Sequence, residues 1–251
     1  MLWYKSWLET RWRFLIGLFL LLCSAAGAVL SYPQVLKLLP QVPPDADGLL
    51  GEKIREAADL ARTYRGFVWS SWFRQNLTQA ASLFAVLLGT ASFLSLEGGS
   101  LFTLSLPVSR RRLVCVRAAT GLAELSLLVF VPSLLIPLLS PSVGERYTLG
   151  SALIHSACLF IAASVFFGLT LLLSTIFSDV WRPLLIALAV AFALAVADQF
   201  LHSPSFSLYR LMSGETYFRT GQLPWGGLLA AAAASASLHA AAIANLTRRD
   251  F

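Results

Sequence analysis

Charged residues are scarce in this sequence: they make up 13% of its 251 residues, whereas hydrophobic residues make up 57%. A soluble domain usually contains about 25% charged residues, so the composition excludes an ordinary water-soluble fold. The few charges lie mostly between long apolar stretches. These stretches are residues 14–31, 77–96, 113–139, 149–177, 181–201 and 223–246.

Cysteine is also rare, and several catalytic motifs are absent. Cys23, Cys115 and Cys158 show no C-x-x-C spacing, so we expect packing residues rather than a disulfide framework or metal ligands. The sequence contains no G-x-x-x-x-G-K-[ST] phosphate loop, no H-E-x-x-H and no G-x-S-x-G. We therefore expect no catalytic residue, no metal site and no cofactor in this chain.

The length of the apolar stretches indicates membrane-spanning helices. A helix needs about 20 residues to cross a hydrocarbon layer about 30 Å thick, and the stretches lack the alternation of β-barrel strands. The pattern predicts an all-α, polytopic membrane protein with six transmembrane helices in a single domain over residues 1–251. The seven tryptophans precede or open these stretches, as in an interfacial aromatic belt: Trp3, Trp7, Trp12, Trp69, Trp72, Trp181 and Trp225.

The first apolar stretch allows two interpretations. Lys5, Arg11 and Arg13 precede it, and small residues end it, which is also the pattern of a cleaved signal peptide. The stretch is longer than the roughly 7–15 apolar residues of a signal core. We therefore expect an uncleaved membrane anchor.

The orientation follows from the density of Lys and Arg rather than from their number. The two sides of the predicted membrane carry nearly equal numbers of basic residues, but those on the side of the termini lie in short connections, which the positive-inside rule weights most. We expect both termini in the cytoplasm of a bacterial-type cell, with the chain in its inner membrane. The net charge of +6 comes from residues dispersed along membrane edges, so we expect no nucleic-acid partner.

Two amphipathic helices are predicted outside the spans. Residues 1–13 resemble an interfacial arm on the inner surface. In the outer loop 32–76, apolar residues from Leu50 to Trp72 recur at spacings of three and four and so share one helical face. This helix could be a substrate lid or outer gate, but a helix resting on the outer leaflet is the preferred interpretation.

The inner segment 97–112 has an unusual sequence for a connecting loop. It reads EGGSLFTLSLPVSRRR and keeps several apolar residues on the cytoplasmic side, which something else must cover. Glu97 with Gly98 and Gly99 would end the second span, and Pro107 would end a short helix before Arg110. We expect a short helix parallel to the membrane and suited to docking against another protein.

This segment resembles the membrane subunits of type-2 ABC transporters. Those permeases carry an acidic residue, a Gly-Thr pair, an apolar helix and a PVSR element between their second and third helices. Here the matching residues are Glu97, Gly99, Ser100 in place of the threonine, and Pro107, Val108, Ser109 and Arg110. The terminal RRDF resembles the short basic tail of such subunits.

The resemblance implies a coupling helix that docks a separate ABC ATPase, which binds the ATP and Mg. The docking residues would be Glu97, Gly98, Gly99, Ser100, Pro107, Ser109 and Arg110. It also implies a second permease copy or a sister subunit, and no enzymatic activity in this chain. The small outer face favours export of a hydrophobic or amphipathic compound.

Four charged residues lie within or at the edge of the spans, where a charge is costly. We expect Arg117 and Arg182 to snorkel to the inner surface, and Asp198 to lie at a solvated helix end. Glu124 lies deep in the third span, where it serves either a structural role or the translocation pathway. His155 and His239, alone in apolar helices, are expected to satisfy local hydrogen bonds.

Two other classes of protein share this topology. A noncatalytic scaffold or sensor would give the same pattern of spans. An intramembrane enzyme would need a polar constellation at membrane depth, and the sequence shows no such motif or pair of acids within one span. A transport subunit is therefore preferred, a scaffold comes second and an enzyme a distant third.

Overall fold

The computed structural model describes residues 2–39, 49–91, 109–200 and 207–248. These residues are almost entirely helical and include no β-strand, which confirms the all-α prediction. The long helices are α1 (Leu2–Leu38), α6 (Arg110–Leu139), α7 (Leu149–Ile176), α8 (Trp181–Phe200) and α11 (Trp225–Arg248). The short ones are α2 (Leu49–Ala61), α3 (Tyr64–Val68), the π-helix η2 (Trp69–Leu77), α4 (Thr78–Gly89), the 3-10 helix η3 (Ser140–Val143), α9 (Leu208–Ser213) and α10 (Glu215–Thr220).

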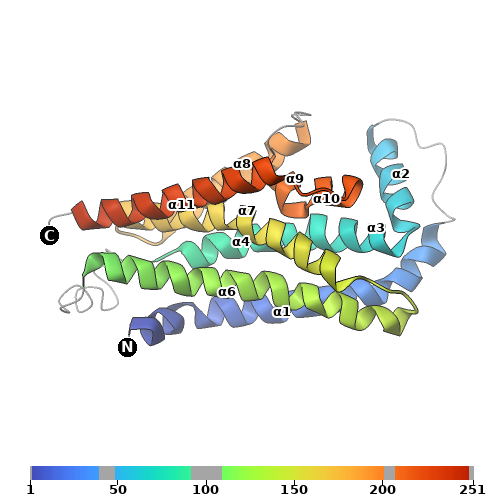
Figure 1. Cartoon of the computed structure of the whole chain (residues 1–251), viewed down its shortest axis with the longest axis horizontal. Coiled ribbons are helices and arrows are strands. Elements are labelled where there is room, and N and C mark those ends of the chain that lie inside the picture. The colour runs from blue at the N-terminus through green and yellow to red at the C-terminus, as the bar shows by residue number, and fades with distance from the viewer. Residues whose placement is uncertain (1, 40–48, 92–108, 201–206, 249–251) are drawn as a thin grey trace.

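The long helices lie side by side along one axis (Figure 1). The start of α1 and the end of α11 lie at the same end of the bundle, which we call the proximal end; α2, α9 and α10 lie at the opposite, distal end. Five helical segments in the described residues are long and apolar enough to cross a membrane. The chain is therefore a multi-pass helical membrane protein.

The predicted second span begins earlier than expected. Helices α3, η2 and α4 follow one another without a gap from Tyr64 to Gly89 and run along the bundle beside the long helices (Figure 1). Residues 92–96 lie outside the described residues, and α4 alone is shorter than a membrane crossing. The number of six crossings stays a prediction.

Helix α7 forms the centre of the bundle, because it packs against α4, α6, α8, α9 and α11. Small residues allow its neighbours to approach closely, as in other membrane bundles. A Cβ atom at Gly89 of α4 would lie 2.7 Å from the carbonyl oxygen of Phe167, and one at Gly121 of α6 would meet the Phe167 ring. By contrast, α8 is the least enclosed of the five candidate spans.

The N-terminal arm differs from the prediction. Residues 2–13 are not a separate surface helix, because α1 is continuous from Leu2 to Leu38. Ser6, Thr10 and Phe14 are buried on one face of this helix, which packs against α6. The arm is thus part of the bundle, and the predicted outer loop 32–76 is shortened because α1 continues past Pro33.

The predicted amphipathic face from Leu50 to Trp72 is interrupted. The backbone of Thr63 is extended, with φ −112° and ψ 136°, and its hydroxyl accepts a hydrogen bond from the Gly66 amide at 3.2 Å, so Thr63 caps a new helix. Trp69 and Trp72 follow this cap and are fully buried. The aromatic-belt prediction is therefore wrong for these two, whereas Trp3, Trp12, Trp181 and Trp225 are exposed.

Both buried tryptophans belong to the π-helix η2. Its turns are wider than α-helical turns, and nearby hydroxyls bond carbonyls of the segment: Thr78 Oγ1 donates to Phe73 at 2.6 Å and Ser71 Oγ to Phe67 at 2.7 Å. One face of η2 buries Trp69, Trp72 and Phe73. The opposite face leaves Arg74, Gln75 and Asn76 exposed.

The close approach at Gly89 predicts a clear effect of added volume. Gly89→Ala is expected to destabilise the protein by about 1–3 kcal/mol, because the new methyl group meets the backbone of α7. Gly27→Ala in α1 is the matched control, since nothing lies within 4 Å of its added Cβ. Thermal unfolding in detergent compares the two, and equal midpoints would contradict the packing described here.

Candidate functional site

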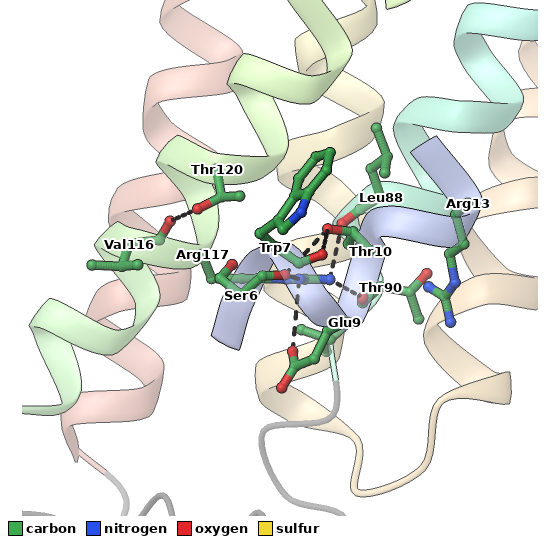
Figure 2. A network of polar contacts seen from close by, with 12 residues as sticks. Ser6, Trp7, Glu9, Thr10, Arg13, Leu88, Thr90, Val116, Arg117 and Thr120 are labelled. Atoms are coloured by element: carbon green, nitrogen blue, oxygen red, sulfur yellow. Dashed lines mark hydrogen bonds and ion pairs between the residues drawn. The ribbon is translucent and has the colours of Figure 1, made fainter. Parts of the chain in front are cut away.

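Arg117 of α6 is the most deeply buried arginine in the described residues, with 5% of its surface exposed. Its guanidinium donates hydrogen bonds to the carbonyl oxygens of Ser6 at 3.2 Å, Leu88 at 3.4 Å and Thr90 at 2.9 Å (Figure 2). These acceptors belong to α1 and to the end of α4. One side chain therefore joins three helices at the proximal end of the bundle.

The end of α4 is a suitable target for arginine. The last carbonyl oxygens of a helix receive no hydrogen bond from amides of the same helix, and they form the negative end of its dipole. Arg13 of α1 also donates to this end, from Nη1 to the Leu87 oxygen at 2.8 Å. Together Arg13 and Arg117 satisfy the carbonyls of Leu87, Leu88 and Thr90.

A buried guanidinium needs charge compensation. Glu9 of α1 supplies part of it, at 3.7 Å from Nη1 of Arg117, although half of the Glu9 side chain is exposed and the pair is screened by solvent. Glu124 lies about two helical turns further along α6. These two carboxylates and the two arginines form a polar cluster between α1, α4 and α6.

Glu124 is 2% exposed and lies inside the bundle. Its Oε1 accepts a hydrogen bond from the Thr10 hydroxyl at 2.5 Å. Its Oε2 has no hydrogen-bond partner among the described residues. This contact gives Glu124 a structural tie to α1; a role in the translocation pathway stays a prediction.

The structure describes only two of the predicted docking residues, Ser109 and Arg110. Glu97, Gly98, Gly99, Ser100 and Pro107 lie outside the described residues. Ser109 and Arg110 form the start of α6: the Ser109 hydroxyl caps the helix by accepting from the Arg112 amide at 3.4 Å, and Arg110 is the first helical residue.

The described chain on either side of residues 92–108 is held by the bundle. On one side, the Thr90 carbonyl accepts from Arg117, and the Ala91 amide donates to Ser174 Oγ of α7 at 3.2 Å. On the other side, α6 begins at Arg110 and reaches Arg117 about two turns later. Both flanks of the connecting segment therefore lie close to the polar cluster in the sequence, at Thr90 on one side and Arg117 on the other.

The remaining predicted polar residues have local partners. Arg182 is 70% exposed and pairs with Asp179 at 3.2 Å, whereas Asp198 pairs with Arg210 at 3.4 Å. His155 Nδ1 lies 3.2 Å from the Ser213 oxygen, and His239 Nδ1 lies 2.6 Å from the Ser235 oxygen. Between the spans, burial raises the pKa of the Tyr147 phenol, although Arg65 acts in the opposite direction.

The prediction that Arg117 snorkels is wrong, because its guanidinium turns inward to the carbonyls of α1 and α4. The acceptors could not be found from local sequence, since they lie 27, 29 and 111 residues away. Ser6 contributes only its backbone carbonyl, which any residue could supply, so its side chain gave no signal of this contact. The Thr10 hydroxyl, one turn further along α1, binds Glu124.

Among the described residues, no group of three or more His, Cys, Asp or Glu side chains is placed to hold a metal ion. Comparisons with protein-family models, curated proteins and solved structures gave no match to this chain. The resemblance to type-2 ABC permeases therefore depends on the residues of segment 97–112 and the terminal tail.

The carbonyl contacts of Arg117 predict a specific loss on substitution. Arg117→Gln should lower the free energy of unfolding by about 3 kcal/mol, because buried carbonyls and Glu9 lose their partner. Arg117→Lys should give an intermediate loss, since lysine keeps the charge but cannot reach acceptors on two helices at once. Thermal unfolding in detergent measures both.

Arg111→Gln is the control, because Arg111 lies six residues away on the same helix and is exposed. It should unfold like the unmodified protein. An Arg117→Gln variant as stable as the control would show that the guanidinium does not hold the three helices together.

Proposed function

We propose that this chain is the membrane-spanning permease subunit of an ATP-driven transporter of the type-2 ABC class, and that a separate ATPase docks on segment 97–112. The proposal rests on the resemblance of that segment and on one structural observation. Arg117 binds the end of α4, immediately before the segment, from its position near the start of α6, immediately after it.

The polar cluster gives the segment a mechanical connection to the bundle. A docked partner that displaces residues 97–112 would move the ends of α4 and α6 together, because Arg117 joins them. The Ser6 and Leu87 contacts extend this connection to α1. The three helices then move as one body, as expected of a subunit that is driven from outside.

The same proposal includes a second copy of this chain or a sister permease, since six helices are few to enclose a pathway. It places the proximal end, with both termini, in the cytoplasm of a bacterial-type cell. Export of a hydrophobic or amphipathic compound is the expected direction and substrate class.

Copurification tests the docking step. The full chain carrying an affinity tag is co-expressed with candidate ABC ATPases, and the ATPase recovered with it is quantified. Glu97→Lys and Arg110→Glu should each lower recovery by about tenfold, because a reversed charge opposes a docking contact instead of supporting it.

Arg182→Glu is the matched control, since Arg182 is also a basic residue at the proximal end but lies outside segment 97–112. It should leave recovery unchanged. If the unmodified chain retained none of the ATPases, the transporter proposal would be wrong, and a scaffold or sensor role would take its place.

A further inference from the structure

A cavity of about 810 Å³ lies at the distal half of the bundle. One side of it is the polar face of η2 and α4, formed by Ser70, Ser71, Arg74, Gln75, Thr78 and Gln79. Helices α2, α9 and α10 contribute its distal part, and these helices gather at that end of the molecule (Figure 1). Its volume lies within the range of sites that bind drug-sized ligands.

The charges around the cavity balance. Three arginines and three acids line it, namely Arg74, Arg210, Arg219, Glu56, Asp198 and Glu215. They are arranged in pairs: Arg219 contacts Glu215 at 2.7 Å and Glu56 at 3.2 Å, and Arg210 contacts Asp198 at 3.4 Å. The cavity therefore offers both signs of charge and an excess of neither.

Glu56 links two sides of the cavity. Its Oε1 atom lies 3.2 Å from Arg219 of α10 and 3.7 Å from Arg74 of η2. Arg74 is held in place by Trp69, whose ring lies 5.5 Å from its guanidinium and stacks on Phe218 of α10 at 4.3 Å. Because one carboxylate oxygen serves two arginines, and the contact with Arg74 is long, Arg74 retains donors for another anion.

Apolar residues line other parts of the cavity. Val35 of α1, Leu60 of α2 and Ala195 of α8 come from the helices that flank the polar face. Arg74 lies roughly 20 Å along the helical run from Gly89, at about 1.5 Å per residue. The polar face therefore belongs to the distal half of the bundle, away from the end that holds Arg117.

We infer that this cavity binds the zwitterionic head of an amphipathic molecule, with the anionic group at Arg74 and the cationic group at Asp198 and Glu56. A purely anionic head would leave the acids opposing it, and a purely cationic head would be opposed by the arginines. A head group that carries one positive and one negative charge can replace an ion pair of the lining: its anion binds the arginine and its cation binds the carboxylate. The net charge of the cavity then stays unchanged. The apolar walls accommodate the first part of its tail.

This inference depends on the proposed transport function only in naming the bound molecule a substrate. Binding is tested on the purified full-length chain without any ATPase, by native mass spectrometry in detergent. The probes are dioleoyl phosphatidylcholine, dioleoyl phosphatidylglycerol with the same tails, and soluble phosphocholine. We expect one saturable phosphatidylcholine per chain, bound about tenfold more tightly than phosphatidylglycerol.

Two substitutions should shift this preference in opposite directions. Glu56→Gln leaves the lining with excess positive charge and should bring phosphatidylglycerol binding up to that of phosphatidylcholine. Arg74→Gln leaves excess negative charge and should weaken phosphatidylglycerol binding about tenfold more than phosphatidylcholine binding, so the preference for phosphatidylcholine widens. The double variant restores the balance of charge and should regain part of the preference for phosphatidylcholine.

The control is an exposed pair at the end of α2. Asp59 and Arg62, the residue after the helix, lie 3.5 Å apart and outside the cavity lining. Asp59→Asn and Arg62→Gln should change neither the preference nor thermal unfolding. A general loss of fold would lower the unfolding midpoint and weaken both lipids in every variant, whereas the inference requires opposite shifts at an unchanged midpoint.

Equal binding of the two lipids by the unmodified chain would overturn the inference, and so would a preference that neither variant altered. If phosphocholine bound as tightly as the lipid, the apolar walls would have no role and the assignment to an amphipathic molecule would be wrong. These results are independent of ATPase recovery, which depends on the opposite end of the molecule.

Discussion

The hydrogen bonds from Arg117 to the end of α4 are the interaction on which the proximal half of this protein depends. A guanidinium at membrane depth is costly unless its donors find acceptors, and here two helices provide carbonyls for it. The same contact solves a second problem, because a helix end without partners for its carbonyls is also unfavourable in lipid. The guanidinium supplies donors for the carbonyls at the end of α4, and these carbonyls supply acceptors for the guanidinium, so neither is left without hydrogen bonds.

The packing around α7 reinforces this arrangement. Gly89 and Gly121 allow α4 and α6 to approach Phe167 from different sides, and Ser235 of α11 donates to the Ser164 carbonyl of α7 at 3.2 Å. In lipid, helix association depends on such close contacts rather than on the hydrophobic effect. The arginine contacts tie α1, α4 and α6 together, and the small residues attach that unit to α7 and α11.

The sequence was sufficient to predict the helical class and most of the spans, because a run of apolar residues of membrane length has few other interpretations. The limits of α7 and α11 agree with the predicted stretches to within about two residues, the usual uncertainty of helix ends. The prediction was poorer between Pro33 and Leu77. There a continued α1, the Thr63 cap and the π-helix change which residues face inward, and each depends on contacts with other helices.

The candidate site was predicted only in part. Glu124 was identified because a carboxylate within an apolar run is conspicuous in any sequence. Arg117 was noticed for the same reason, but its direction was wrong, since a side chain of that length reaches either the surface or a neighbouring helix. Only the tertiary placement of Ser6 and Thr90 decides between the two, and neither residue is unusual in its own segment.

The two halves of the helical run from Tyr64 to Gly89 make different contacts. Its first half presents a polar face to the distal cavity, and its last turn is bound by Arg13 and Arg117. Substitutions in the first half can therefore accumulate during evolution without disturbing the last turn. The polar lining of the cavity and the arginine-bound helix end can thus vary independently, although both belong to one helical run.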